Sequence, residues 1–182
     1  CGYISSFPYS DNFDTYETAS FPRCWQRLST TSSNYPYIDL YTPGHYDHTY
    51  STSGMMVFPS GYNSFAILPE IDPATPINEL QISFQYKTYN PAAMLIVGVM
   101  DDPEDATTFT PVDTMQLEYH QVEHWAEKKV HLHNYTGNGH YIALRGYGYL
   151  DNVLLEHSTC PLPHDISVTN ITDQSADIIS RS

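Results

Sequence analysis

The alternation of apolar and polar residues along the chain predicts a protein built from short β-strands. The segment 80–86, LQISFQY, alternates at a period of two, as a strand with one buried face does. The segment 94–100, MLIVGVM, is an unbroken apolar run, which predicts a strand buried on both faces. Six further segments carry weaker strand patterns: 55–58, 64–68, 116–119, 130–132, 141–147 and 152–156.

Proline and glycine separate these segments. Turn-forming sequences occur at 59–61, 72–76, 101–103 and 136–139. The chain has no long stretch with the period of an α-helix, and we expect only a short helical turn within 104–109. Many short strands at this spacing predict an all-β protein, specifically a jelly-roll β-sandwich of two antiparallel sheets.

The composition changes after Cys160, which is followed by Pro161-Leu162-Pro163. Each proline fixes φ and removes a hydrogen-bond donor, so the sequence predicts a stiff linker there. We expect a main domain over 1–158, a linker over 159–164 and the start of another unit over 165–182. This last segment resembles the first two strands of a fibronectin type III domain, which needs roughly 100 residues to form its core.

The charge of the chain narrows its possible partners. Seven Lys and Arg against 21 Asp and Glu give a net charge of −14, which opposes binding to phosphate backbones and to anionic lipid. No apolar run approaches the roughly 20 residues of a membrane span, so we expect neither a nucleic acid partner nor membrane insertion. The 16 tyrosines and 13 prolines favour an all-β secreted or cell-surface protein.

The chain has three cysteines, Cys1, Cys24 and Cys160. They lack the close paired spacing of a zinc site, and three cannot all pair within one chain. One disulfide and one free thiol is the simplest interpretation. A Cys1–Cys160 bond would suit domain termini that lie close together, a Cys1–Cys24 bond fits the spacing equally well, and three unpaired cysteines are the remaining alternative.

A wider resemblance rests on several short motifs that occur in order along residues 3 to 157. They are 7–14 (FPYSDNFD), 21–25 (FPRCW), 97–103 (VGVMDDP) with 109–112 (FTPV), 135–143 (YTGNGHYIA) and 150–153 (LDNV). The ordered set resembles the MAM-like and cleaved-adhesin jelly-roll domains of bacterial surface proteins, which are related to the adhesin regions of gingipain-type proteases. The resemblance implies a non-catalytic module for adhesion, with a glycan, a host protein or a neighbouring protein as its partner.

The same resemblance implies a structural calcium ion where the first and last strands of the domain meet. Asp14 and Asp151 match the acidic positions of the opening and closing motifs, and Asp11, Asn12 and Asn152 are possible additional ligands. Calcium takes six to eight oxygen ligands, some from carboxylates and some from backbone carbonyls. The alternative is that Asp14 caps a turn while Asp151 is solvated or accepts backbone hydrogen bonds.

One motif raises the possibility of an enzyme. His120, Glu123 and His124 form the pattern H-x-x-E-H, which on a helix places two histidines on one face to bind zinc while the glutamate handles the proton of a water molecule. The flanking segments alternate like strands, so we expect this motif to lie on a strand or loop, where the histidines are farther apart. No other catalytic motif was found, and we expect no catalytic residue.

Tyrosines gather in a polar segment before the first clear strand. The candidate ligand-binding residues are Tyr37, Tyr41, Tyr46 and Tyr50. Aromatic rings on loops can stack on sugars or anchor a protein interface. They can equally pack on a sheet with their hydroxyl groups in water. The sequence therefore favours an adhesion or carbohydrate-binding or protein-binding module; the alternatives are a structural spacer beside a catalytic domain and a zinc hydrolase that uses His120, Glu123 and His124.

Overall fold

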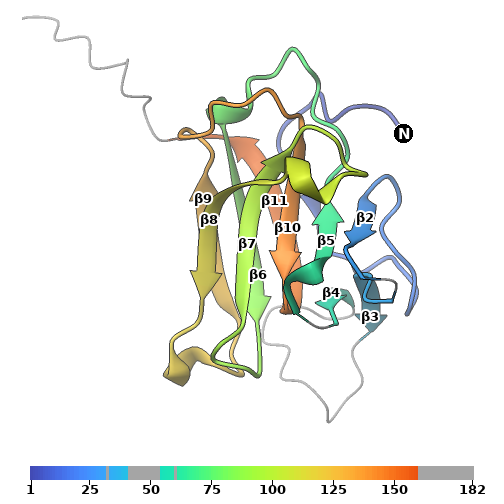
Figure 1. Ribbon diagram of the computed structural model, residues 1–182, viewed down its shortest axis with the longest axis vertical. Helices are drawn as coiled ribbons and strands as arrows, with labels where there is room; N and C mark the ends of the chain where they lie inside the picture. Colours follow the sequence, from blue (N-terminus) through green and yellow to red (C-terminus); the bar gives the residue numbers. More distant parts are fainter. Residues whose placement is uncertain (32, 41–53, 60, 160–182) are drawn as a thin grey trace, which may run out of the picture.

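The computed structural model describes residues 1–31, 33–40, 54–59 and 61–159, and the predicted linker and fibronectin-like segment lie outside this part of the chain, as does Cys160. The described elements form two antiparallel sheets packed face to face (Figure 1), which confirms the predicted β-sandwich. In chain order they are β1 (Tyr9–Asp11), β2 (Gln26–Ser29), β3 (Tyr37–Leu40), β4 (Gly54–Phe58), the 3-10 helix η1 (Gly61–Asn63), β5 (Ser64–Ile67), η2 (Ile77–Glu79), β6 (Leu80–Lys87), β7 (Met94–Met100), η3 (Ala106–Thr108), β8 (Thr110–Gln116), η4 (Tyr119–Gln121), β9 (Ala126–His131), β10 (Tyr141–Gly146) and β11 (Gly148–His157).

Each sheet pairs strands that are distant in the sequence. One sheet has the order β3-β4-β11-β6-β9, with β1 paired to β11, and the other has the order β2-β5-β10-β7-β8. The ten-residue strand β11 is central to the first sheet. One of its edges pairs with β6, and successive parts of its other edge pair with β4 and with β1. The register of β11 on β6 shifts between Asp151 and Leu154, which marks a bulge.

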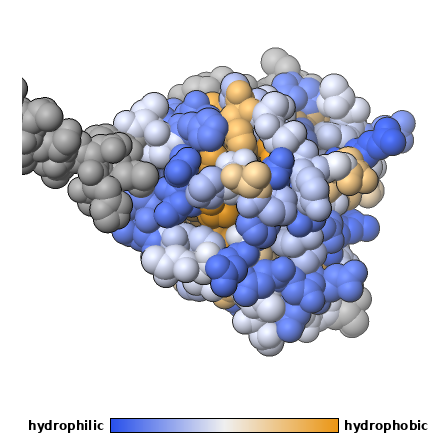
Figure 2. Space-filling model, turned by 90° about the horizontal axis from the view of Figure 1, so that it is seen from above, coloured by the Kyte–Doolittle hydropathy of each residue, from blue (hydrophilic) through white to orange (hydrophobic). Residues whose placement is uncertain are grey.

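The core lies between the two sheets and is filled by the inward faces of their central strands. Fully buried residues include Ile82, Phe84 and Tyr86 of β6 and Leu95, Val97 and Val99 of β7. Tyr86 keeps its hydroxyl group satisfied by donating a hydrogen bond of 2.6 Å to the carbonyl oxygen of Tyr147. Each such large side chain contributes roughly 1.5–3 kcal/mol to the free energy of unfolding by its burial. Seen end-on in Figure 2, polar residues surround the apolar surface that shows between them.

The predicted strands agree best with the structure where the strand is central. β6 and β7 occupy the predicted segments, and the predicted helical turn is η3. The prediction of a strand at 116–119 is wrong, because β8 runs from Thr110 to Gln116 and η4 follows. β8 is an edge strand whose residues are mostly exposed or half-buried, so its apolar pattern is weak. Among the described residues, no helix is long and apolar enough to cross a membrane.

Candidate functional site

The predicted calcium ligands lie where β1 and β4 meet along the edge of β11. Asp11 is the last residue of β1 and pairs with Val153. One carboxylate oxygen of Asp11 accepts a hydrogen bond of 3.0 Å from the backbone N–H of Phe13, and the other accepts one of 3.0 Å from the Tyr16 hydroxyl group. The carboxylate of Asp11 therefore organises the turn that follows β1.

Asp14 joins this turn to the start of β4. Its Oδ1 atom accepts a hydrogen bond of 3.0 Å from the backbone N–H of Gly54, and its Oδ2 atom accepts one of 2.8 Å from the side-chain amide of Asn12. Gly54 has no room for a side chain, because a Cβ atom there would overlap the carbonyl group of Phe13. The turn and the strand are consequently in direct backbone contact.

Asp151 lies on β11 between the part paired with β4 and the part paired with β1. Its side chain is fully buried, and its Oδ1 atom accepts a hydrogen bond of 2.7 Å from the backbone N–H of Asn152. Asn152 has a φ of 50° and donates a side-chain hydrogen bond of 2.8 Å to Gln85 on β6. The left-handed backbone at Asn152 accommodates the bulge in β11.

The structure thus brings Asp11, Asn12 and Asp14 together in one turn and places Asp151 on the strand beside them. No group of three or more His, Cys, Asp or Glu side chains within the described ranges is placed to hold a metal ion. Calcium, however, also accepts backbone carbonyl oxygens, and a fully buried carboxylate such as Asp151 is the kind of donor it takes. The donor types at this junction of β1, β4 and β11, carboxylates together with backbone carbonyl groups, are of the kind that calcium takes.

The H-x-x-E-H motif lies outside any α-helix. η4 ends at Gln121, and Glu123 has a φ of 75°, so His120 and His124 do not share a helical face. We expected the motif on a strand or loop; its first two residues lie instead in the 3-10 helix η4, and the rest follows outside any helix. The paired-histidine geometry that the zinc chemistry requires is therefore missing from this segment.

The tyrosine candidates are only partly covered by the described residues. Tyr37 is half-buried on β3, opposite Val57 of β4, whereas Tyr41, Tyr46 and Tyr50 lie outside the described residues. The neighbouring Tyr35 is 39% exposed, and the Arg27 guanidinium group lies 5.5 Å from the centre of its ring. The proposed role of these tyrosines in ligand binding remains a prediction.

A pocket that the sequence did not reveal lies next to the junction of β1, β4 and β11. We call it the N-terminal pocket; its volume is about 490 Å³, and its wall includes Tyr3, Ser5, Tyr9, Asp11, Tyr16 and Arg23. The volume is within the roughly 300–1,000 Å³ typical of small-ligand sites. The pocket joins an extended N-terminal segment to β1 and to the loop before β2, so no single stretch of sequence contains it. The sequence indicated Asp11 only as a possible calcium ligand and indicated neither Tyr9 nor Tyr16 as a site residue.

Two attachments hold the N-terminal wall of the pocket in place. The disulfide bond Cys1–Cys24 links the start of the chain to the loop before β2. Ile4 forms a parallel bridge with Ile71, donates a hydrogen bond of 2.8 Å to Glu70 and accepts one of 3.0 Å from Asp72. Of the pairings that the sequence left open, the structure therefore shows Cys1–Cys24. A pocket wall fixed in this way loses little freedom when a ligand binds.

The polar groups of the pocket wall form a connected set. The indole N–H of Trp25 donates a hydrogen bond of 2.8 Å to the hydroxyl oxygen of Tyr9. Burial raises the pKa of Tyr9 and the pKa of Tyr16 to about 12, so both phenols are neutral hydrogen-bond donors at neutral pH. Burial also raises the pKa of Asp11 above its ordinary value, while hydrogen bonds from Phe13 and Tyr16 act in the opposite direction.

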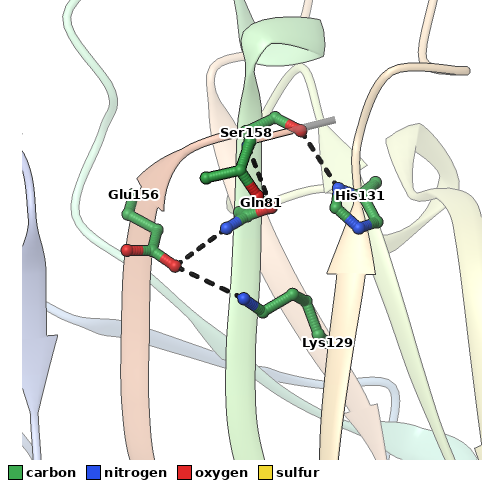
Figure 3. A network of polar contacts seen from close by, with 6 residues as sticks. Gln81, Lys129, His131, Glu156 and Ser158 are labelled. Atoms are coloured by element: carbon green, nitrogen blue, oxygen red, sulfur yellow. Dashed lines mark hydrogen bonds and ion pairs between the residues drawn. The ribbon is translucent and has the colours of Figure 1, made fainter. Parts of the chain in front are cut away.

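A second polar cluster, shown in Figure 3, fastens the end of β11. Gln81 of β6 is fully buried and donates a hydrogen bond of 2.8 Å to Glu156, whose carboxylate lies 3.7 Å from the Lys129 ammonium group. His131 of β9 is 3.0 Å from the Ser158 hydroxyl group. These contacts link three neighbouring strands, and all of these groups have partners within the cluster. We interpret the cluster as structural.

Comparison with known proteins places the fold. No protein-family model matches the chain, and no curated protein sequence is significantly similar to it. The K1 cleaved adhesin domain of Lys-gingipain from Porphyromonas gingivalis W83 is similar in structure, with a TM-score of 0.63 at 15% identity over 84% of this chain and 99% of that one. The K3 cleaved adhesin domain from the same organism has a TM-score of 0.59 at 16% identity over 81% and 98% of the two chains. The chain thus has the fold of a cleaved adhesin domain, as the sequence motifs implied.

Proposed function

We propose that the chain is a non-catalytic binding module of a larger secreted or cell-surface protein, and that it engages a glycan or a protein through the N-terminal pocket. The observation that carries the proposal is the pocket itself. It is open, large enough for a ligand, and lined by tyrosine hydroxyl groups together with the side chains of Asp11 and Arg23. Recognition sites typically combine aromatic residues with a few polar groups that are held in place.

The structural comparison supports the same role. The Lys-gingipain domains that share this fold over nearly their whole length are named adhesin domains. We extend that role, as a proposal, to this chain. The net charge of −14 agrees with the proposed adhesive function, because it disfavours nucleic acid as the partner.

A structural calcium ion is the second part of the proposal. Asp14 and Asp151 would hold it, together with backbone carbonyl oxygens of the junction between β1, β4 and β11. The buried carboxylate of Asp151 supports this assignment, because a bound cation offsets the free energy that burying a charge costs. The ion would fasten the two ends of the domain to each other and would take no part in ligand chemistry.

Binding by the full chain to arrays of glycans and of extracellular proteins tests the proposed function. We expect at least one retained ligand and no chemical turnover of it. A structural spacer should retain no ligand from either array, and this outcome would refute the proposal. A zinc hydrolase should instead contain zinc and lose its activity in His124→Ala, whereas we expect this variant to bind the retained ligand as the wild type does.

A further inference from the structure

We infer that the N-terminal pocket recognises an uncharged saccharide, with the Tyr9 hydroxyl group as hydrogen-bond donor, Asp11 as acceptor and the Tyr3 ring as a stacking surface. This inference rests on the proposed function, because it names the ligand class of the same pocket. Three features carry it: the hydrogen-bonding capacity left in the wall, the balance of charge in the wall, and the exposed aromatic ring at its edge.

The first feature is an incomplete set of hydrogen bonds. A phenol can donate one hydrogen bond and accept others. The Tyr9 oxygen accepts from the Trp25 indole, and among the described residues its own proton has no acceptor. The Asp11 carboxylate accepts one hydrogen bond at each oxygen and also interacts with the Trp25 side chain, and acceptor capacity remains because each oxygen can accept two hydrogen bonds. A donor and an acceptor two residues apart on the same short strand lie on one face of it and suit adjacent sugar hydroxyl groups, which both donate and accept.

The second feature is the balance of charge. Asp11 is the acidic residue in the pocket wall and Arg23 is the basic one. An anionic ligand would be attracted by Arg23 but repelled by Asp11 and by a chain of net charge −14. A cationic ligand would meet the reverse conflict with Arg23. The wall therefore favours a ligand that carries no net charge and satisfies both groups through hydrogen bonds.

The third feature is apolar contact. Within the described ranges Tyr3 is one of four exposed tyrosines, and 55% of the surface of the residue is accessible. It lies on the pocket wall with Ile4 and Pro69 nearby. The faces of a pyranose ring that carry C–H groups pack well on an aromatic ring. The polar groups of the pocket wall would thus bind the hydroxyl groups of one sugar, and the Tyr3 ring would pack on its C–H face.

The test uses the full chain and a defined probe set. Neutral methyl glycosides of glucose, galactose, mannose and N-acetylglucosamine are compared with methyl glucuronide as the anionic probe, by saturation-transfer NMR and titration calorimetry. We expect a neutral glycoside to bind. Tyr3→Ala, Tyr9→Phe and Asp11→Asn should each weaken that binding about tenfold, the effect of losing one good contact.

Tyr119→Ala is the matched control. Tyr119 is 84% exposed and belongs to η4, outside the pocket, so its removal should leave affinity unchanged. Tyr9→Phe also leaves the Trp25 N–H without its acceptor, so Tyr3→Ala, which disturbs no hydrogen bond shown in the pocket, keeps the test valid if Tyr9→Phe unfolds.

Four results would overturn the inference. If methyl glucuronide alone binds, the charge argument is wrong. If a neutral glycoside binds equally well to the wild type and to Tyr3→Ala and Asp11→Asn, saccharides bind outside the N-terminal pocket, and only the general role of a binding module survives. If no glycoside binds while the protein array gives a ligand, the ligand class is wrong but the binding module stands; if neither array nor glycosides give a ligand, both proposals fail.

Discussion

Single carboxylates near β1 differ in what surrounds them. Asp14 accepts hydrogen bonds from Gly54 and Asn12 in a partly open turn, whereas Asp11 lies against Tyr16 and beneath the N-terminal segment. Burial is the main reason why the pKa of Asp11 is raised. The surroundings of Asp11 therefore make its contribution to stability depend on pH.

The pH dependence of unfolding should report the buried Asp11. Because its pKa is raised in the folded state, the folded chain keeps the proton at pH values where the unfolded chain, with a pKa near 3.8, has lost it. Stability from this group is therefore greatest below pH 3.8 and falls as the pH rises through the folded pKa. Asp11→Asn should remove this fall, so its stability relative to the wild type should increase from pH 3.5 to pH 7.

Urea unfolding at a series of pH values, with a chelator present so that no cation contributes, measures this difference. Asp105→Asn provides a contrast of opposite sign, because hydrogen bonds from Thr107 lower the pKa of Asp105 at the surface. The quantity compared is the free energy of unfolding of Asp11→Asn minus that of the wild type. If this value stays constant or falls as the pH rises, the prediction is wrong.

A single glycine determines whether β1 and β4 can meet. In Gly54→Ala the new methyl group would overlap the Phe13 carbonyl group, and backbone atoms cannot move away as a side chain can. We expect a loss of about 2 kcal/mol or more in the free energy of unfolding, as for other overpacked sites. Gly2→Ala is the control, since no atom lies within 4 Å of a Cβ atom there. Equal melting temperatures for the two variants would show that the junction is looser than described.

At the scale of elements, the sequence predicted the strands that carry their own apolar pattern. β6 alternates and β7 is apolar throughout, so both could be located from local sequence. β1 and β2 are only three and four residues long and mostly half-buried, which leaves too few positions to show a period. The N-terminal pocket was missed for a related reason: its walls come from separate elements, and only the three-dimensional arrangement brings them together.

The disulfide bond should stabilise the N-terminal elements more than any single contact there. It closes a loop over a sequence separation of 23 residues, and the chain-entropy estimate for a loop of this size is about 3 kcal/mol. Cys1→Ser with Cys24→Ser should lower the free energy of unfolding by about that amount. Urea unfolding measures it, and peptide mapping should recover a Cys1–Cys24 peptide; recovery of Cys1 joined to Cys160 would contradict the structure.

The junction of β1, β4 and β11 should respond to calcium if the proposed ion is bound. A cation that binds only the folded protein stabilises it, so the melting temperature should fall in a chelator and recover on adding calcium. Asp151→Asn should abolish this response. An identical melting temperature for metal-free and calcium-loaded protein would remove the ion from the proposal.

At the scale of the whole molecule, the described part of the chain continues to contact the two sheets just after the end of β11. The backbone N–H of Ser158 donates a hydrogen bond of 2.7 Å to Glu79, and the side chain of Ser158 contacts His131. We therefore expect the domain to be complete at Thr159.

A truncated chain tests this boundary. A chain ending at Thr159 should melt within about 2 °C of the full 182-residue chain, since it keeps every core residue of the described ranges. A chain ending at Asn152 loses half of β11 and should not fold. A large fall in the melting temperature of the longer truncation would mean that residues beyond 159 contribute to the domain.

The position of β11 also affects when the protein can fold. Because the last strand is the one on which β1, β4 and β6 all assemble, the first sheet lacks its centre until residue 157 has been synthesised. Pairing the first strand with the last closes a loop of nearly the whole domain, which is slow to form. We therefore expect a nascent chain to complete its first sheet only after residue 157 has left the ribosome, so that its earlier strands wait without their central partner.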